Sequence, residues 1–348
     1  MLAYTIRRLL IAIPILLIAS MFAFFLVEVS SDPINNYRQQ LEQNAVASGM
    51  DAKAIDASVE LFEERNYYDR STPERYWLWL TGIGGNGDIG LLQGEFGPSL
   101  RGGGNYDIKA ELGKRFFITL RLVFLATIFS MGLAMLAGVI MAVRQYKKID
   151  YILTLIGFVA LSMPVFWFAQ LIKNTAVSYN KATGTDTFAT YGDSAPGGTG
   201  GMSTGEAILD ALSHLVLPTL VLMLAGYAGA SRFQRSAMLD VLNSDYVRLA
   251  RAKGLRNGTV MRRHALRTAL IPMATIAPVA ILAAMAGAVV TETVFEWQGM
   301  GKFFVDALGQ RDPFAIQAFL IISGALTVVG VLISDLLYGI VDPRIRYE

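Results

Sequence analysis

Residues 245–272 read DYVRLARAKGLRNGTVMRRHALRTALIP, a basic stretch between two long apolar runs. We expect two short helices with a break between them. The Asn-Ser-Asp run at 243–245 supplies helix-capping side chains, and Lys253-Gly254 supplies a cation and then a glycine that end the first helix. Asn257-Gly258 is a turn signal, and Thr259 is placed to cap the second helix.

The first of these two helices carries both apolar and basic residues. Tyr246, Leu249 and Ala250 follow an i, i+3, i+4 spacing, which predicts a small apolar stripe. Arg248 and Arg251 fall on another face. Such a helix either lies on anionic lipid or docks its stripe into a groove on a soluble partner. On pattern alone, three apolar residues favour the lipid alternative.

The same stretch resembles the cytoplasmic coupling loop of ABC importer permeases. It is closest to the version in the oligopeptide, dipeptide and nickel permease family, DYVRTARAKGL followed by HALRNALIP. The wider importer motif is E-A-A-x3-G-x9-I-x-L-P, which this chain matches at Ala250, Gly254 and Leu266. It departs from that motif at Arg248, Leu249, His264 and Arg267, and at Arg248, His264 and Arg267 it agrees with the peptide-family version.

In that family the loop docks into a cleft on an ATP-hydrolysing subunit, and the resemblance implies the same role here. It assigns an ATPase-coupling helix to Asp245, Tyr246, Arg248, Leu249, Ala250, Arg251, Lys253 and Gly254.

The composition indicates a membrane protein. Of the 348 residues, 53% are hydrophobic and 17% charged, and the mean hydropathy is +0.44. This is too apolar for an ordinary soluble domain of this length. A net charge of +2 gives no reason to expect nucleic acid, and the absence of cysteine excludes disulfides and thiolate chemistry. His214 and His264 stand in no ligand pattern, so no metal site is expected.

Long apolar runs predict an all-α protein with six transmembrane helices. The runs cover residues 9–27, 116–143, 151–172, a stretch from 215 onward, 268–290 and 314–341. We expect Pro164 to kink the third span, and Pro272 and Pro278 to break the fifth. In the fourth span, Ala225 and Gly229 are four residues apart, a spacing that permits close helix contact.

A polar segment between the first two spans predicts an extracytoplasmic subdomain. We expect helices at 33–47, at 51–65 and from Thr72 onward. The segment is too short for a large core, so we expect it to rest on the spans or on a partner. Farther along, residues 173–211 predict a flexible outer loop with a glycine-rich part at 197–201.

The chain is therefore predicted to consist of three parts. Residues 1–29 hold the N-terminal segment and first span, and residues 30–114 the subdomain. Residues 115–348 form a core of five transmembrane helices with the coupling loop at 243–267.

Basic residues indicate the orientation in the membrane. The predicted inner segments contain the arginines of the coupling loop and Arg7, Arg8, Arg144, Lys147, Lys148, Arg344 and Arg346. The shorter outer loops contain Lys173, Lys181, Lys302 and Arg311. By the positive-inside rule, both termini are expected in the cytoplasm.

The sequence contains no motif typical of an enzyme. There is no G-x-x-x-x-G-K-[ST], so the chain does not bind ATP phosphates as P-loop proteins do. The main charge within a span is Asp335, for which a hydrogen bond or ion pair to a neighbouring helix or the basic tail is favoured over a proton relay. Glu28, Glu292 and Glu296 end spans on the outer side, where we expect them to be solvated or paired. Glu292 and Glu296 are also placed to touch a docked partner.

Further motifs resemble the same family in the same order. They are GEFG at 94–97, HLVLP at 214–218, DLLY at 335–338 and DPRIR at 342–346. The resemblance implies a type I importer fold in the bacterial cell membrane and peptide uptake by alternating access. It also implies a second, similar permease subunit, two ATPase subunits that bind ATP and Mg²⁺, and an extracytoplasmic substrate-binding protein.

Other functions stay open at this point. Nickel chelates or oligosaccharides are alternative cargoes within the family. An ion-coupled secondary transporter that works alone is a different class, which the sparse charges in the spans and the lack of an evident inverted repeat disfavour. A membrane anchor or scaffold would carry out no transport.

Overall fold

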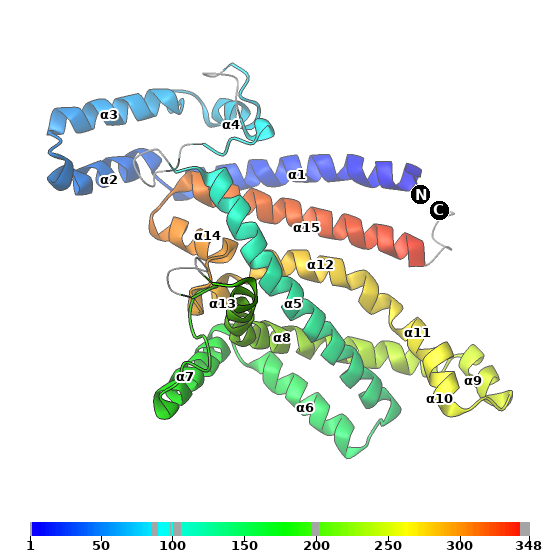
Figure 1. The fold of residues 1–348 in the computed structure, drawn as a ribbon. Coiled ribbons are helices and arrows are strands. Elements are labelled where there is room, and N and C mark those ends of the chain that lie inside the picture. Colours follow the sequence, from blue (N-terminus) through cyan, green and yellow to red (C-terminus); the bar gives the residue numbers. More distant parts are fainter. Residues whose placement is uncertain (1, 85–89, 98, 100–105, 196–201, 342–348) are drawn as a thin grey trace. The chain divides into compact units, whose positions relative to one another are not determined.

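The computed structural model of the chain describes residues 2–84, 90–97, 99, 106–195 and 202–341 (Figure 1). Over these residues the chain is helical and contains no strand, as predicted. The glycine-rich run at 197–201 and the DPRIR tail at 342–346 lie outside the described residues.

The elements are α-helices except η1 and η3, which are a 3₁₀ turn and a π-helix. In chain order they are α1 (Leu2–Ser30), α2 (Pro33–Ser48), α3 (Ala52–Arg65), α4 (Thr72–Thr81), η1 (Leu91–Gln93), α5 (Ile108–Val143), α6 (Lys148–Ser162), α7 (Val165–Thr183), α8 (Thr204–Leu242), α9 (Asp245–Ala252), α10 (Asn257–Thr259), η3 (Val260–Ala265), α11 (Leu266–Ala269), α12 (Ile271–Gly287), α13 (Val289–Val294), α14 (Met300–Gly309) and α15 (Pro313–Val341).

The helices long and apolar enough to cross a membrane agree with the predicted spans. In the described part of the chain, α1, α5, α8 and α15 meet this criterion as single helices. Two bent pairs meet it together, α6 with α7 and the segment Asn257–Ala269 with α12. Counting each pair as one span gives six.

The third predicted span is broken rather than kinked. The axes of α6 and α7 differ by 102°. Met163 and Pro164 are extended, with ψ of 126° and 133°. A residue before proline is pushed out of the helical region, so α6 cannot continue through Met163. Pro164 instead precedes α7, where its missing N–H removes no helical hydrogen bond.

The fifth span bends by 41° near Leu270. Pro272 stands in the first turn of α12, a position that tolerates proline. Pro278 lies inside α12 without ending it, so the predicted break at that residue is wrong.

The predicted outer loop at 173–211 is helical at both of its ends. α7 continues to Thr183, and α8 begins eight residues before the predicted end of the loop. Ser203 and Glu206 form a capping box, in which the Ser203 N–H donates to Glu206 Oε2 over 2.8 Å. These side chains satisfy backbone groups that a helix start leaves open, which fixes the beginning of α8 at this point.

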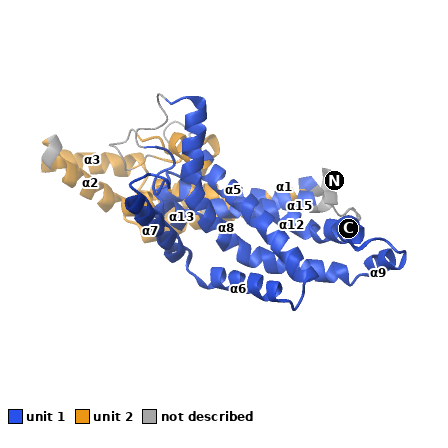
Figure 2. Cartoon of the chain, turned by 60° about the horizontal axis from the view of Figure 1, so that its bottom comes forward, with its two compact units in different colours: residues 1–6, 117–302, 326–348 blue, residues 7–116, 303–325 orange. Residues whose placement is uncertain are grey.

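The chain divides into two compact units (Figure 2). One comprises residues 1–6, 117–302 and 326–348, and the other comprises residues 7–116 and 303–325. The division into parts at residues 29 and 114 stays a prediction.

Within the second unit, α4 packs on α1. Arg75 forms an ion pair with Glu28, so Glu28 is paired as expected. The Tyr76 hydroxyl lies 2.8 Å from Ser20 Oγ. The rings of Trp79 and Phe24 approach within 5.3 Å. The polar segment between the first two spans therefore rests on the first span.

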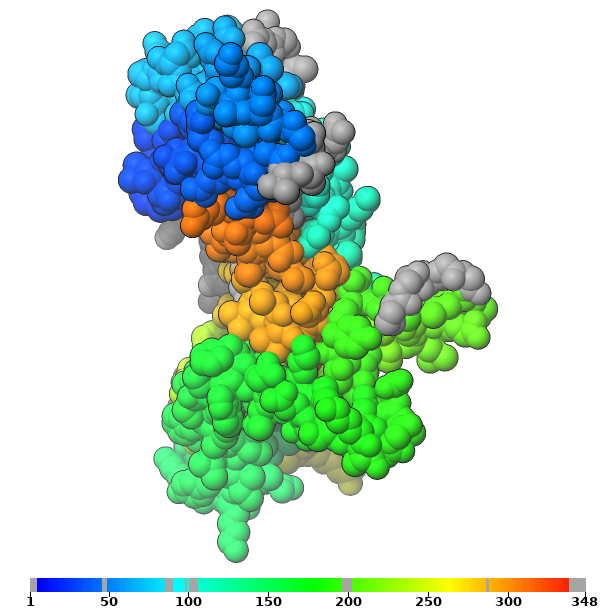
Figure 3. All heavy atoms as spheres, turned by 90° about the vertical axis from the view of Figure 1, so that its left-hand side faces the viewer, coloured from blue at the N-terminus to red at the C-terminus, as the bar shows by residue number. Residues whose placement is uncertain are grey.

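The helix pair α2–α3 has a small aromatic centre and a polar attachment. The Phe62 ring stacks on Tyr37 at 4.3 Å and on Tyr68 at 5.9 Å. Side-chain amides of α2 donate to the turn after α14, Asn36 to the Arg311 carbonyl over 3.3 Å and Gln40 to the Gln310 carbonyl over 3.4 Å. Figure 3 shows the blue atoms of α2 directly against this orange segment.

We predict that Phe62→Ala loosens the α2–α3 pair, whereas Leu61→Ala does not. Phe62 is 8% exposed and Leu61 is 64% exposed. Removing a buried phenylalanine costs about 3 kcal/mol. The measurement is the rate of limited proteolysis within α3 of the purified protein. Equal rates for the two variants would show that the aromatic stack does not stabilise this pair.

Candidate functional site

The hairpin at residues 243–269 begins with α9, whose two ends follow the sequence prediction. The helix starts after Ser244 and its last turn closes at Lys253. Gly254 then adopts φ +74°, and its N–H donates to the Arg251 carbonyl over 2.9 Å. A side chain at Gly254 would meet open space, so glycine is required there by backbone conformation and not by crowding.

The two faces of α9 differ from the predicted stripe. Val247 and Ala250 are 0% and 5% exposed and pack in one cluster with Met238 of α8. Tyr246 and Leu249 are 44% and 56% exposed. The prediction that Ala250 shares a face with them is wrong. Val247, which the sequence analysis did not single out, is the residue that packs with Ala250 against the rest of the chain. Its i, i+3 spacing from Ala250 places the two on one face of the helix and could have indicated this.

The other predicted coupling residues are exposed, like Tyr246 and Leu249. They are Asp245, Arg248, Arg251, Lys253 and Gly254. Arg248 pairs with Asp245 at 2.8 Å, and both side chains are mostly solvated. α9 therefore packs on its own chain by one face and presents Tyr246 and Leu249, edged by cations, on the other.

The second arm of the hairpin begins earlier than predicted. Its first helical residue is Asn257, after Arg256 with ψ 136°. The turn expected at Asn257-Gly258 and the cap expected at Thr259 are therefore both part of the helix. From Val260 the arm widens into the π-helix η3 before α11. π-helical turns inside helices are rare and occur often at functional sites.

Polar contacts hold the base of the hairpin. The Arg235 guanidinium of α8 donates to both carboxylate oxygens of Asp150, at 3.1 and 2.9 Å. Asp150 is buried at the start of α6 and also accepts from the Tyr146 N–H over 3.0 Å. Gln234 Nε2 donates to the Ala269 carbonyl over 3.1 Å. These contacts tie the inner end of α8 to α6 and to α11.

Sequence reasoning missed this arrangement in part. It did not single out Arg235 or give Asp150 a partner. Asp150 stands in the first turn of α6, where a carboxylate is favoured by the helix dipole. That position was a signal for a structural role, although it does not identify Arg235.

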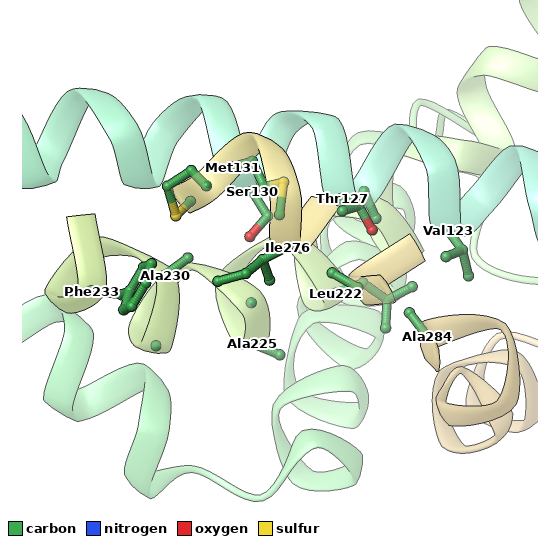
Figure 4. Close-up of a pocket in the computed structure, with 15 residues that line it drawn as sticks. Val123, Thr127, Ser130, Met131, Leu222, Ala225, Ala230, Phe233, Ile276 and Ala284 are labelled. Atoms are coloured by element: carbon green, nitrogen blue, oxygen red, sulfur yellow. The ribbon is translucent and has the colours of Figure 1, made fainter. Parts of the chain in front are cut away.

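A cavity of about 430 Å³ lies among α5, α8 and α12 (Figure 4). Figure 4 shows Ser130, Leu222 and Ile276 projecting from three different helices toward one space. Ala225 and Gly229 also line it. The close helix contact that their spacing permits stays a prediction. A β-carbon at Gly229 would have no described atom within 4 Å beyond its own helix backbone and adjoining residues.

Two of the helices that line the cavity, α8 and α12, directly precede and follow the hairpin. α8 lines the cavity from Leu222 to Phe233 and then runs on to α9. α12 lines it from Met273 to Ala284 and follows η3 and α11. A displacement of the hairpin therefore acts directly on two walls of the cavity.

A second polar cluster joins α5, α13 and the start of α14. Glu292 is fully buried, and its carboxylate accepts from the Thr119 hydroxyl at 2.6 Å and the Gly301 N–H at 2.7 Å. It also accepts from the Lys302 N–H at 3.1 Å. Of the two alternatives expected for Glu292, solvated or paired, the hydrogen bonds support the second. Its burial leaves it unavailable to a docked partner, whereas Glu296 is exposed.

The remaining charged residues near span ends have local partners. Arg121 pairs with Asp193 at 2.7 Å and lies over the Trp297 ring at 5.0 Å. Asp335 is half-buried in α15, and the basic tail proposed as its partner lies outside the described residues. Among the described residues, no group of three or more His, Cys, Asp or Glu side chains is arranged to hold a metal ion.

Comparison with known proteins gives matches over the whole chain. Residues 134–347 match the family described as binding-protein-dependent transport system inner membrane component. The oligopeptide transport system permease protein AppB of Bacillus subtilis is 39% identical, with 100% of both chains covered. The oligopeptide permease protein OppB of Mycobacterium tuberculosis is 35% identical, covering 99% of this chain and 98% of its own. The dipeptide permease protein DppB of Escherichia coli is 30% identical over 100% of both chains.

We predict that Glu292→Gln destabilises the chain and that Glu296→Gln does not. The glutamine side chain replaces one carboxylate oxygen by an NH₂ group. That group is itself a donor and cannot accept from the Thr119 hydroxyl or from the Gly301 and Lys302 N–H groups. The expected cost is about 1–3 kcal/mol. It should appear as a lower midpoint of heat-induced unfolding in detergent. A midpoint equal to that of Glu296→Gln would contradict a structural role for the Glu292 carboxylate.

Proposed function

Because this chain belongs to the family of binding-protein-dependent transport system inner membrane components, we propose that it is the permease subunit of an ATP-driven peptide importer. The observation that carries the proposal is the full-length match to relatives named as oligopeptide and dipeptide permeases. The chain is a multi-pass membrane protein, and a permease component of this kind is not itself catalytic.

The proposal includes partners for the chain. A binding protein supplies peptide from outside, and ATPase subunits supply the energy. In the finer form of the proposal there are two ATPase subunits, which bind ATP and Mg²⁺, and a second, similar permease subunit. The complex lies in a bacterial cell membrane with both termini of this chain in the cytoplasm, an orientation supported by the placement of basic residues.

We propose α9 as the element that the ATPase contacts. Tyr246 and Leu249 are exposed apolar side chains on a short helix, and such a pair is suited to docking in a groove. The cations around it supply charge steering toward an acidic rim. The structure makes docking possible without unfolding, because Val247 and Ala250 already pack the opposite face against the chain.

Transport then requires a change of shape and no covalent step in this chain. Binding of ATP moves the ATPase subunits and with them α9. Because α9 packs on α8 and the base of α8 is tied to α6 and α11, the motion is carried into the spanning helices. ATP needs only to favour one of two arrangements of the helices by its differential binding.

We predict that Leu249→Asp abolishes uptake while the protein still folds and inserts. Leu249 is exposed, so a charge there leaves the chain intact but is desolvated in the docked complex. Uptake of a labelled peptide by the complete transporter should fall at least about tenfold, the effect expected for a buried unpaired charge. The amount of chain in the membrane and the capture of the ATPase subunits are measured alongside.

Val247→Asp is the matched comparison on the opposite face of the same helix. Its charge would lie in the buried cluster, so this variant should lose folded protein rather than coupling. Normal uptake by Leu249→Asp, with capture of the ATPase unchanged, would end the assignment of α9. The lipid alternative predicts that result, together with a dependence of activity on anionic lipid.

A further inference from the structure

Gln234 of α8 contacts the fifth span at the point where that span bends. α11 ends at Ala269, Leu270 lies in neither helix and α12 begins at Ile271, and the segments on the two sides differ in direction by 41°. The Gln234 Nε2 donates to the Ala269 carbonyl over 3.1 Å. Gln234 and Ala269 are 0% and 1% exposed, so water does not compete for this hydrogen bond.

The bend changes the donor that the Ala269 carbonyl meets. In an uninterrupted α-helix this carbonyl would accept from the Met273 N–H, four residues further on. Here the helix is interrupted at Leu270, and Gln234 supplies a donor from another helix. Pro272 contributes to the interruption, because it has no N–H and its ring crowds the carbonyl four residues before it. A side chain therefore satisfies the Ala269 carbonyl in the bent form, whereas the backbone would satisfy it in a straight form.

Close contact with α5 holds Gln234 from its other side. A β-carbon at Gly138 of α5 would lie 2.7 Å from Gln234 Cβ and 2.8 Å from the Ser231 carbonyl oxygen, so only glycine permits this approach. The next residue, Arg235, is bound to Asp150 of α6. Gln234 thus belongs to a frame made by α5, α6 and α8, while the carbonyl that it binds belongs to the hairpin side of the bend.

The Gln234 amide is only half satisfied. Its Oε1 is buried and accepts no hydrogen bond from the part of the chain that the structure describes. A buried polar atom without a partner costs stability, so packing alone would be served better by an apolar side chain. What this position gains from glutamine is the N–H group that meets the Ala269 carbonyl.

We propose that Gln234 is a positioning residue that holds the fifth span in its bent form and releases the Ala269 carbonyl to the Met273 N–H when the hairpin is displaced. The bent form is the resting one, and the straight form is populated when ATP is bound. The inference rests on the proposed function and adds where a spanning helix changes shape and which side chain opposes the change. One hydrogen bond replaces another, so a modest bias from ATP binding is sufficient.

The test replaces Gln234 by methionine, an unbranched apolar side chain of similar length that cannot donate. Without the amide, straightening is the way to give the Ala269 carbonyl a donor. The straight form should become about fivefold more populated, as expected for one lost hydrogen bond. The complete transporter, reconstituted in vesicles, should therefore hydrolyse ATP about fivefold faster in the absence of its binding protein. With the binding protein, it should hydrolyse more ATP for each labelled trialanine taken up.

Amide hydrogen exchange separates this role from a merely structural one. Exchange in residues 266–276 is followed by mass spectrometry in the complete transporter without nucleotide. Gln234→Met should slow exchange in this segment, because the Met273 N–H gains a helical hydrogen bond. A loss of packing alone would have the opposite effect and speed exchange.

Gln317→Met is the matched control. Gln317 of α15 is 4% exposed, and its Oε1 also has no hydrogen-bond partner among the described residues, but it belongs to the other compact unit. The same substitution there should leave both ATP hydrolysis without the binding protein and exchange in residues 266–276 unchanged.

Pro272→Ala acts on the same bend from the backbone. It returns an N–H to the helix and removes the ring that crowds the preceding turn, so it favours the straight form. ATP hydrolysis without the binding protein should rise in this variant too. This result tests the proposal even if Gln234→Met does not fold.

Several outcomes would overturn the proposal. Unchanged ATP hydrolysis in Gln234→Met, or in Pro272→Ala where Gln234→Met does not fold, would show that the span does not change shape at this bend. Faster exchange in residues 266–276, or an equal effect of Gln317→Met, would show that Gln234 only packs. Each of these leaves the proposed function standing, because the unaltered transporter takes up peptide. Failure of that transporter with every peptide would instead contradict the proposed function.

Discussion

A buried carboxylate sets the geometry where α6 and α8 meet next to the hairpin. Asp150 is buried, so its carboxylate is stabilised by hydrogen bonds from two N–H groups of Arg235 and from the Tyr146 N–H. Removing one partner from such a pair leaves an uncompensated charge and costs several kcal/mol. The geometry therefore allows α6 and α8 little freedom to slide past one another, and the hairpin that follows α8 starts from a fixed base.

In the proposed mechanism, α9 and α8 together carry the motion of the ATPase to the spanning helices. Val247 and Ala250 fasten α9 to the chain, Tyr246 and Leu249 stay available, and α8 continues without interruption to the cavity wall at Gly229. Most of these contacts are apolar, and apolar packing is not directional. The polar contacts at Asp150 and Gln234 are directional, and in the proposed mechanism they help to pass a displacement of α9 on to α8.

The sequence predicted the helical class, the six apolar segments and the ends of α9, because these depend on local features. Gly254 at a helix end and the apolar runs are examples. It did not predict the 102° angle at Pro164, since proline excludes a helical residue before it but does not fix the new direction. The burial of Glu292 depends on residues far away in sequence, such as Thr119. Which face of α9 packs against the rest of the chain likewise depends on other elements, for example on Met238 of α8. The open space at Gly229 likewise arises from three separate helices, and spacing within one helix could not reveal it.

The break at Pro164 also bears on the lipid around the protein. α6 has 15 residues, which at 1.5 Å each extend about 22 Å, less than the roughly 30 Å of a bilayer's hydrocarbon core. α7 then leaves at 102° and does not prolong it. A short spanning helix draws the two leaflets together around itself at a modest cost per ångström of mismatch. The arrangement of α6 against α8 is consequently coupled to bilayer thickness, and a thicker membrane would strain this corner of the protein first.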